Sequence, residues 1–196
     1  MRTQEQIIDK SLKETYIEID NIVALMFTKK NIPEFLDVVE DLLINGYVKG
    51  AKDTLEMLGE DTAEIDELNI IPSMQSALNH TTEGLTYRNR IILGFFEYST
   101  KEMQRLVGNE YHLMYCSGQN DIAKSYEATT GKRVYKTWHT MNDDKVRDTH
   151  AYLEDESIPI DDYFYTWDGD KARFPGDFEK PENCINCRCR LTYSVL

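Results

Sequence analysis

Three of the four cysteines in the chain lie within six consecutive residues, in the stretch PENCINCRCRL. Cys184 and Cys187 have the Cys-x-x-Cys spacing with which a tight turn offers two thiolates to a zinc ion, and Cys189 follows as a third ligand. A tetrahedral site needs a fourth ligand, for which we favour His150, with His139 as the second choice. The residue types therefore predict a zinc site at Cys184, Cys187, Cys189 and His150.

Two other interpretations of these cysteines stay open. No second ligand pair stands at a regular spacing, so a cysteine-bearing core strand with a free Cys184 is the alternative without metal. A dithiol redox role at Cys184 and Cys187 would need a lowered thiol pKa at a helix start, whereas this segment leads into an expected strand. Four cysteines and no charged-then-apolar leader at Met1 predict an intracellular protein made under reducing conditions, so we expect no disulfides.

A second group of candidate residues is Asp143, Arg147 and His150. If residues 143–153 form a short helix, these three lie on one face, where Arg147 can pair with Asp143. Such a trio is typical of a structural hydrogen-bond network, and it could also bind a phosphate or a carbonyl group in an enzyme. The chain has no glycine-rich phosphate loop and no HExxH motif, so we expect no enzyme and no catalytic residues.

Charge and hydropathy exclude several classes of partner. The formal net charge of -13 over 196 residues opposes nonspecific attraction to nucleic acid, because phosphate binding depends mainly on Lys and Arg. Any DNA contact would have to be local. The ten carboxylates between Glu154 and Glu182 favour a solvated, loop-rich surface over a cation site or a docking face for a basic partner. Apolar runs such as IILGFF are far shorter than the roughly 20 residues that cross a bilayer, so we expect no membrane contact.

The residues before 132 have the spacing of helices. Apolar residues recur every three or four positions in 4–27, and Pro33 precedes a second helix that Gly46 is expected to cap. We expect a third short helix over 49–58, a connection over 59–72, further helices after it, and a long helix that begins near Ser99 and stops at 129–131. Ser99 and Glu102 have capping-box spacing, and the Ser117-Gly118 pair is a candidate kink. His112 and Cys116 share one face of this helix, which makes them a candidate metal pair, but we expect them to be packing residues.

The residues from 132 onward have a different pattern. KRVYKTWHT is rich in β-branched and aromatic residues and predicts a strand, and Phe174 to Asp177 spell the turn sequence FPGD. In the closing strand Cys187 and Cys189 should face the core, with Arg188 and Arg190 on the opposite side. The expected fold class is α+β: a helical N-terminal two-thirds with a long helix leading into a small C-terminal module with antiparallel strands. We divide the chain into regions 1–71, 72–131 and 132–196.

Taken together, these motifs resemble the minor head protein family of tailed phages, the Mu F-like or head morphogenesis proteins. The resemblance covers about 132–196 and lies in a Trp-bearing strand, an Asp with Arg four and His seven residues later, a Pro-Gly-Asp turn and an Asn-Cys-Arg-Cys ending. The matching residues are Trp138, Asp143, Arg147, His150, Pro175, Gly176, Asp177, Asn186, Cys187, Arg188 and Cys189. Cys184 is extra to the family motif, and the helix with Asn109 and Glu110 is loosely similar to the region before this module.

The resemblance implies a structural protein of the virion. Members of the family join the capsid at low copy number, associate with the portal vertex during head assembly in the cytoplasm of the bacterial host, and sometimes contact the packaged DNA. The same module also accompanies effector domains in bacterial toxins. The alternatives are therefore a toxin-like effector or enzyme that uses Asp143, Arg147 and His150, and a zinc-stabilised protein interaction module.

Overall fold

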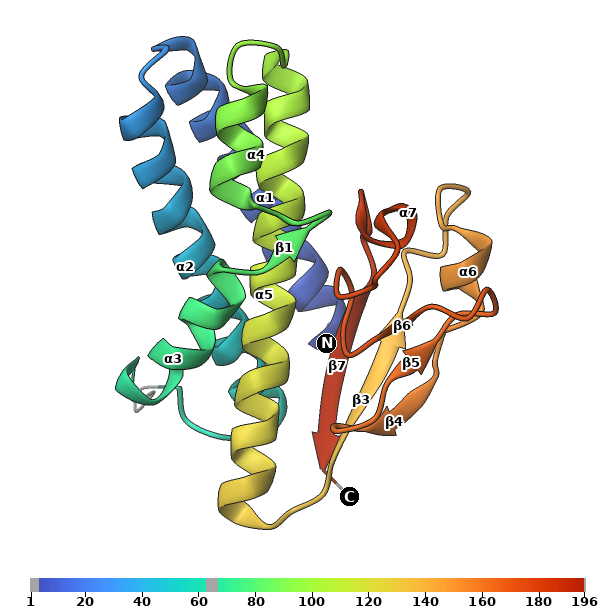
Figure 1. Ribbon diagram of the computed structural model, residues 1–196. Coiled ribbons are helices and arrows are strands. Elements are labelled where there is room, and N and C mark those ends of the chain that lie inside the picture. The colour runs from blue at the N-terminus through green and yellow to red at the C-terminus, as the bar shows by residue number, and fades with distance from the viewer. Residues whose placement is uncertain (1–3, 63–66, 196) are drawn as a thin grey trace.

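The computed structural model describes residues 4–62 and 67–195 and shows a layer of helices beside small antiparallel sheets (Figure 1). This confirms the expected α+β class. The helices of the first layer are α1 (Gln4–Thr28), α2 (Ile32–Met57), α3 (Glu67–Leu78), α4 (Tyr87–Gly94) and α5 (Thr100–Thr130), with a short hairpin of β1 (Thr81–Thr82) and β2 (Leu85–Thr86) before α4. None of the described helices combines the length and the apolar character that crossing a membrane requires.

The longest helix, α5, begins and ends where local signals in the sequence predict. The Ser99 side chain accepts a hydrogen bond from the Glu102 backbone N–H, and the Glu102 carboxylate accepts one from the Ser99 backbone N–H at 2.8 Å. This reciprocal arrangement is a capping box. Gly131 closes the helix with a φ of 70°, a left-handed conformation that suits glycine. The helix runs for 31 residues and continues through Ser117 and Gly118 without a break.

The expected end of the second helix at Gly46 is wrong. Gly46 is buried inside α2, which runs without a break to Met57, so the expected third helix is its continuation. The reason is tertiary packing against α5: a Cβ atom on Gly50 would lie 2.0 Å from the carbonyl oxygen of Tyr115, and one on Gly118 would lie 2.1 Å from that of Tyr47. The close approach of the two backbones outweighs the helix cost of glycine, about 1 kcal/mol.

The expected connection over 59–72 is too long. Helix α3 begins at Glu67, and Pro72 lies inside it. Pro72 is the sixth residue of α3, beyond the first N–H groups that have no intrahelical partner, so the helix forms with one backbone hydrogen bond fewer at this position. The acidic residues and Pro72 predict a connection, but the second part of this segment forms the start of α3.

The C-terminal module is built on a three-stranded antiparallel sheet with β3 (Val134–His139) between β4 (Ser157–Pro159) and β7 (Arg190–Val195). Alternate residues of β3 are buried, as the expected strand requires. Strand β7 also contacts α2 and α5, so the sheet edge lies against the helical layer (Figure 1). The module is completed by α6 (Asp148–Ala151), α7 (Pro181–Cys184), β5 (Phe164–Tyr165) and β6 (Lys171–Ala172).

The start of the closing strand differs from the prediction. Cys187 and Cys189 are buried, but they lie in the segment before β7, which begins only at Arg190. Arg188 is exposed as expected, whereas Arg190 is only 5 % exposed, so the expectation that both arginines face solvent is wrong for Arg190. The physical reason is that the chain covers Arg190: it pairs with His139 on β3, and its guanidinium lies 4.0 Å from Sδ of Met141.

The FPGD sequence forms the expected turn. The backbone N–H of Asp177 donates to the carbonyl oxygen of Phe174 at 3.1 Å, and Gly176 between them has a φ of 93°. That positive angle follows Pro175, as in a type II turn. The Asp177 carboxylate accepts hydrogen bonds from the backbone and the guanidinium of Arg173, which joins the turn to the segment before it.

Candidate metal centre

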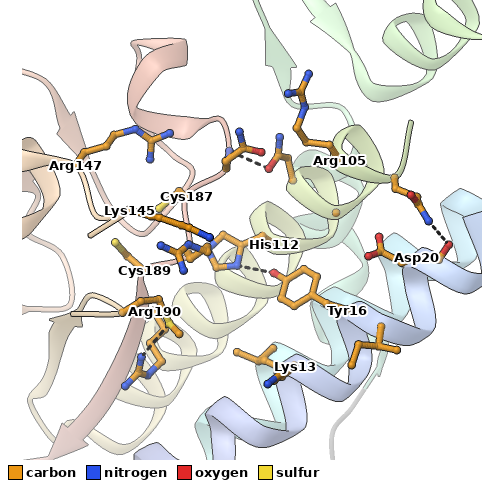
Figure 2. A pocket seen from close by; sticks show the side chains of 18 residues that line it. Lys13, Tyr16, Asp20, Arg105, His112, Lys145, Arg147, Cys187, Cys189 and Arg190 are labelled. Atoms are coloured by element: carbon orange, nitrogen blue, oxygen red, sulfur yellow. Dashed lines mark hydrogen bonds between the residues drawn. The ribbon is translucent and has the colours of Figure 1, made fainter. Parts of the chain in front are cut away.

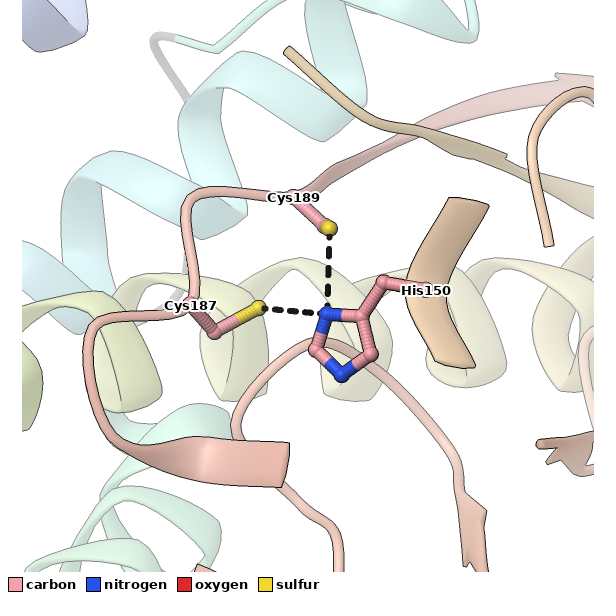
Figure 3. A group of neighbouring side chains, drawn as sticks. All are labelled: His150, Cys187 and Cys189. Carbon is pink, nitrogen blue, oxygen red and sulfur yellow. Dashed lines mark hydrogen bonds between the residues drawn. The ribbon is translucent and has the colours of Figure 1, made fainter. Parts of the chain in front are cut away.

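Three of the four predicted zinc ligands meet in the interior. The Nδ1 atom of His150 lies 3.4 Å from Sγ of Cys189 and 3.7 Å from Sγ of Cys187 (Figure 3). The three side chains are buried, and their ligand atoms all lie within 4.8 Å of one another. A histidine on α6 and two cysteines before β7 thus offer three metal-ligating atoms to one point.

The spacing of these atoms fits a tetrahedral metal. With Zn–S bonds of about 2.3 Å and Zn–N bonds of about 2.0–2.1 Å, a sulfur and a nitrogen on one tetrahedral zinc ion lie about 3.5 Å apart. The two observed sulfur-to-nitrogen distances, 3.4 and 3.7 Å, stand on either side of that value. The arrangement therefore suits zinc in both ligand type and geometry.

Aromatic packing holds the imidazole of His150 in place. Its ring stacks on Phe178 with centroids 5.2 Å apart and an interplanar angle of 24°, and it meets Trp138 edge to face at 5.8 Å. Its Nε2 atom is buried and has no hydrogen-bond partner among the described residues. The orientation of the ring, with Nδ1 toward the thiols, therefore comes from the core around it.

Backbone and side-chain contacts position the cysteine segment. The Asn109 side-chain oxygen on α5 accepts a hydrogen bond from the backbone N–H of Asn186 at 3.0 Å, and the Arg147 guanidinium donates to the carbonyl oxygen of Ile185. Arg188 pairs with Asp143 through two hydrogen bonds of 2.7 and 2.6 Å.

The expected pairing of Arg147 with Asp143 is therefore wrong. Residues 143–147 are not helical, because α6 begins only at Asp148, so the assumed one-face spacing does not exist. Asp143 and Arg147 instead make separate contacts to the segment that carries the cysteines. Hydrogen bonds from Arg188 lower the pKa of the Asp143 carboxyl to about 2.

The fourth predicted ligand, Cys184, lies apart from the other three. Its thiol donates to the carbonyl oxygen of Phe178 at 3.1 Å. Burial, together with the nearby Cys187, raises the pKa of this thiol to about 12. The second-choice histidine, His139, lies elsewhere, beside Glu154 and Asp155.

A further histidine and cysteine approach the cluster from α5. His112 Nε2 lies 3.8 Å from Sγ of Cys116, and the hydroxyl of Tyr16 on α1 lies 2.9 Å from His112 Nδ1. Burial lowers the pKa of the His112 imidazole, but the thiols of Cys116 and Cys187 and the hydroxyl of Tyr16 raise it well above its ordinary value overall. The helical spacing predicts the shared face of His112 and Cys116, but no local signal in the sequence indicates that this face meets the cysteine segment.

The two thiols of the cluster titrate in opposite directions. Hydrogen bonds from Cys189, His112 and His150 lower the pKa of the Cys187 thiol well below its ordinary value, although burial opposes this. The bond to Cys187, together with burial, raises the pKa of Cys189.

A cavity of about 830 Å³ opens beside the cluster, between α1, α5 and the cysteine segment (Figure 2). His112, Cys187 and Cys189 reach its wall. Among the described residues that line it, Asp20 is the acidic one, against six cationic side chains: Lys13, Arg105, Lys145, Arg147, Arg188 and Arg190. The wall is thus basic in a chain whose net charge is -13.

Comparison with curated proteins and with solved structures finds no match to the chain. Comparison with protein families finds one. The family described as Phage Mu protein F like protein matches residues 73–192, which is more than half of the 196 residues and includes α5, the module and every residue of the cluster. The chain therefore belongs to the Phage Mu F-like family, a family of structural proteins of the phage head.

Proposed function

We propose that the protein is a minor component of the phage head that docks at the portal vertex during assembly. The family match over residues 73–192 is the observation that carries this proposal, because it includes both the long helix and the module. The protein then acts in the cytoplasm of the bacterial host during assembly and afterwards forms part of the virion. Its partners are the portal protein and other capsid proteins.

The contacts of the polar residues in the family-like motif support a structural role over an enzyme. Asp143 pairs with Arg188, and Arg147 holds the carbonyl oxygen of Ile185. His150 is buried among aromatic rings and faces two thiols. These groups are used to hold the cysteine segment in place, so we infer that the module is a folding and docking unit.

An exposed apolar surface at the end of α4 supports docking to another protein. We call it the α4 patch, and it comprises Ile92, Leu93, Phe96 and Tyr98. Phe96 is 78 % exposed, whereas its neighbour Phe95 is buried against Phe27 and Phe35. Grouped apolar side chains on a firm base mark protein interaction surfaces. We assign the portal protein to the α4 patch because the patch lies within the residues that match the family.

Co-purification tests this assignment. The full chain is produced with a tagged portal protein of the same phage, as wild type and as Phe96→Ser. The matched control is Trp167→Ser, which removes another exposed aromatic side chain from the module, far along the chain from the α4 patch. We expect Phe96→Ser to reduce recovery with the portal at least about tenfold, or roughly 1.4 kcal/mol. Equal recovery of all three proteins, or purified virions that lack the chain, would contradict the proposal.

The basic wall of the cavity is where we propose contact with packaged DNA. Counterion release makes such binding depend on salt, with a slope of about 0.9 per phosphate contacted. Arg105→Glu, on the cavity wall, should weaken binding to a DNA duplex and reduce that slope, whereas Lys52→Glu, on the exposed side of α2, makes the same charge change elsewhere. Equal effects of the two variants would exclude the cavity as the DNA contact.

A further inference from the structure

The cluster at the base of the module offers more ligands than the three that already meet. His150 Nδ1, Cys187 Sγ and Cys189 Sγ occupy three corners of a zinc-sized tetrahedron. A structural zinc site is almost always closed by a fourth protein ligand. The candidates for this fourth ligand are the remaining cysteine and histidine side chains near Cys187.

Cys184 does not fit the fourth position. Its thiol donates to the carbonyl oxygen of Phe178 at 3.1 Å, so it is already engaged with a backbone group outside the cluster. The Cys-x-x-Cys spacing therefore does not translate into two ligands of one metal in this fold, because α7 ends at Cys184 and directs its side chain toward Phe178.

His112 fits the fourth position. It is buried on α5, and it lines the same cavity wall as Cys187 and Cys189. Tyr16 holds its Nδ1 atom at 2.9 Å, which leaves Nε2 as the ring nitrogen directed at sulfur. Metal-bound histidines commonly have their second ring nitrogen held by a hydrogen bond in this way, since that fixes the tautomer and the ring orientation.

We propose that His112, His150, Cys187 and Cys189 bind one zinc ion. Two nitrogen and two sulfur ligands make a common structural site. Both thiols lose their protons when the metal binds, and the two imidazoles bind as neutral rings. Cys116 lies 3.8 Å from His112 Nε2, next to the site, and is the alternative ligand that the experiment must exclude.

The consequence of such a site is a link between the two layers of the protein. His112 lies on α5, His150 on α6, and the two cysteines lie before β7, so one ion joins three segments that are distant in the sequence. Metal binding then contributes directly to folding, because these ligands are brought together only in the folded chain. This inference does not depend on the portal or DNA contacts.

Metal content and ligand identity are measured on the full chain, purified without chelator. Elemental analysis should give about one zinc per chain, and less than about a tenth of that overturns the proposal. Cobalt(II) is then exchanged for zinc, and its visible spectrum reports whether the ion is tetrahedral with two thiolates. Zinc affinity is measured by competition with a chromophoric chelator, which needs no other activity.

Three variants separate the candidate ligands. We expect His112→Gln to lower zinc affinity at least about 100-fold and to change the cobalt spectrum, while Cys184→Ser and Cys116→Ser keep both close to wild type. Tyr16→Phe should lower affinity about 10-fold, in the range for residues that hold a ligand in place. Unchanged affinity and spectrum in His112→Gln, or loss of affinity in Cys116→Ser or Cys184→Ser, would overturn the assignment of His112. If His112→Gln fails to fold, the test rests on Tyr16→Phe. A roughly 10-fold lower zinc affinity in that variant supports His112 as a ligand, and an unchanged affinity contradicts it.

Discussion

The helical layer and the C-terminal module are held together by different means. In the helical layer, long apolar faces pack closely, and α2 and α5 approach so tightly that two carbonyl oxygens lie where side chains would be at Gly50 and Gly118. In the module no described strand exceeds six residues, and its interior contains buried polar groups such as Asp170, Lys136 and the His/Cys cluster. Close packing of complementary surfaces specifies the structure of the helical layer, whereas hydrogen bonds and ion pairs between buried polar groups specify that of the module.

The largest effect should come from filling the contact between α2 and α5. Gly118→Ala places a Cβ atom 2.1 Å from the carbonyl oxygen of Tyr47, and a backbone atom cannot move aside as a side chain can. The helices must separate, and we expect the free energy of unfolding to fall by about 3 kcal/mol or more, at the upper end of overpacking effects. Urea denaturation of the purified chain measures this.

Gly108→Ala in the same helix is the matched control. A Cβ atom there meets no other atom within 4 Å. Alanine is the better helix former, so this variant should gain up to about 1 kcal/mol. Destabilisation of similar size in both variants would mean that the close approach of the backbones does not specify the helical layer.

The next effect should come from removing a buried charge in the module. Asp170 accepts hydrogen bonds from the backbone N–H groups of Lys171, Glu179 and Lys180 and from the Asn183 side chain. Asp170→Ala leaves these donors unsatisfied, and we expect a loss of about 2–3 kcal/mol. Asp162→Ala, an exposed carboxylate of the same module, should have little effect.

Hydrogen exchange shows where the loss from Asp170→Ala falls. Amides of residues 171–184 should exchange faster in that variant, while those in the middle of α5 keep their protection. Uniformly faster exchange through both regions would indicate that the module and the helical layer unfold as one unit and that the comparison between them does not hold.

Local signals in the sequence were enough for some features of both regions. The capping box at Ser99, the Gly131 stop, the FPGD turn and the alternation along β3 each depend on neighbours a few residues away, and each was predicted. The continuation of α2 through Gly46 depends on α5, far along the chain, and was missed. Propensity cannot anticipate a partner helix that has no local signature.

The same distinction applies to the candidate site. The residue types and the Cys-x-x-Cys spacing predict one group of Cys184, Cys187, Cys189 and His150, and the fold brings the last three of them together. The inclusion of Cys184 came from spacing alone, whereas its position depends on where α7 ends. The approach of His112 depends on how α5 packs against the module, so only the structure shows it.

The pH dependence of stability should distinguish the two regions further. Lys136 is buried on β3 and donates to the carbonyl oxygen of Arg173 at 2.9 Å. Burial lowers the pKa of its ammonium group to about 7, against about 10.4 in an unfolded chain. Between these values the unfolded chain binds more protons than the folded one, so this residue makes the free energy of unfolding rise with pH.

Lys136→Met removes that contribution. The variant should be more stable than wild type at pH 7, and the difference should shrink toward pH 9 by at most about 1.4 kcal/mol per pH unit. Below about pH 7 both states of the wild type hold the proton, so the difference becomes constant. Thermal or urea unfolding from pH 6 to 9 measures it, and parallel curves for the two proteins would rule out a neutral lysine in the folded module.

The smallest effect should come from the cap of α5. Ser99→Ala removes the hydroxyl that accepts from the Glu102 backbone N–H, which costs about 1 kcal/mol at a typical helix start. Because hydrogen bonds from the Ser99 hydroxyl and backbone lower the pKa of Glu102, the variant should also bring that pKa closer to its ordinary value. NMR titration of the Glu102 carboxyl reports this change. If capping contributes only locally, unfolding shifts slightly and the cobalt spectrum of the metal centre stays as in wild type. A change in that spectrum would show that the cap at the start of α5 helps to position His112. The local capping interaction and the metal site would then be coupled through this helix.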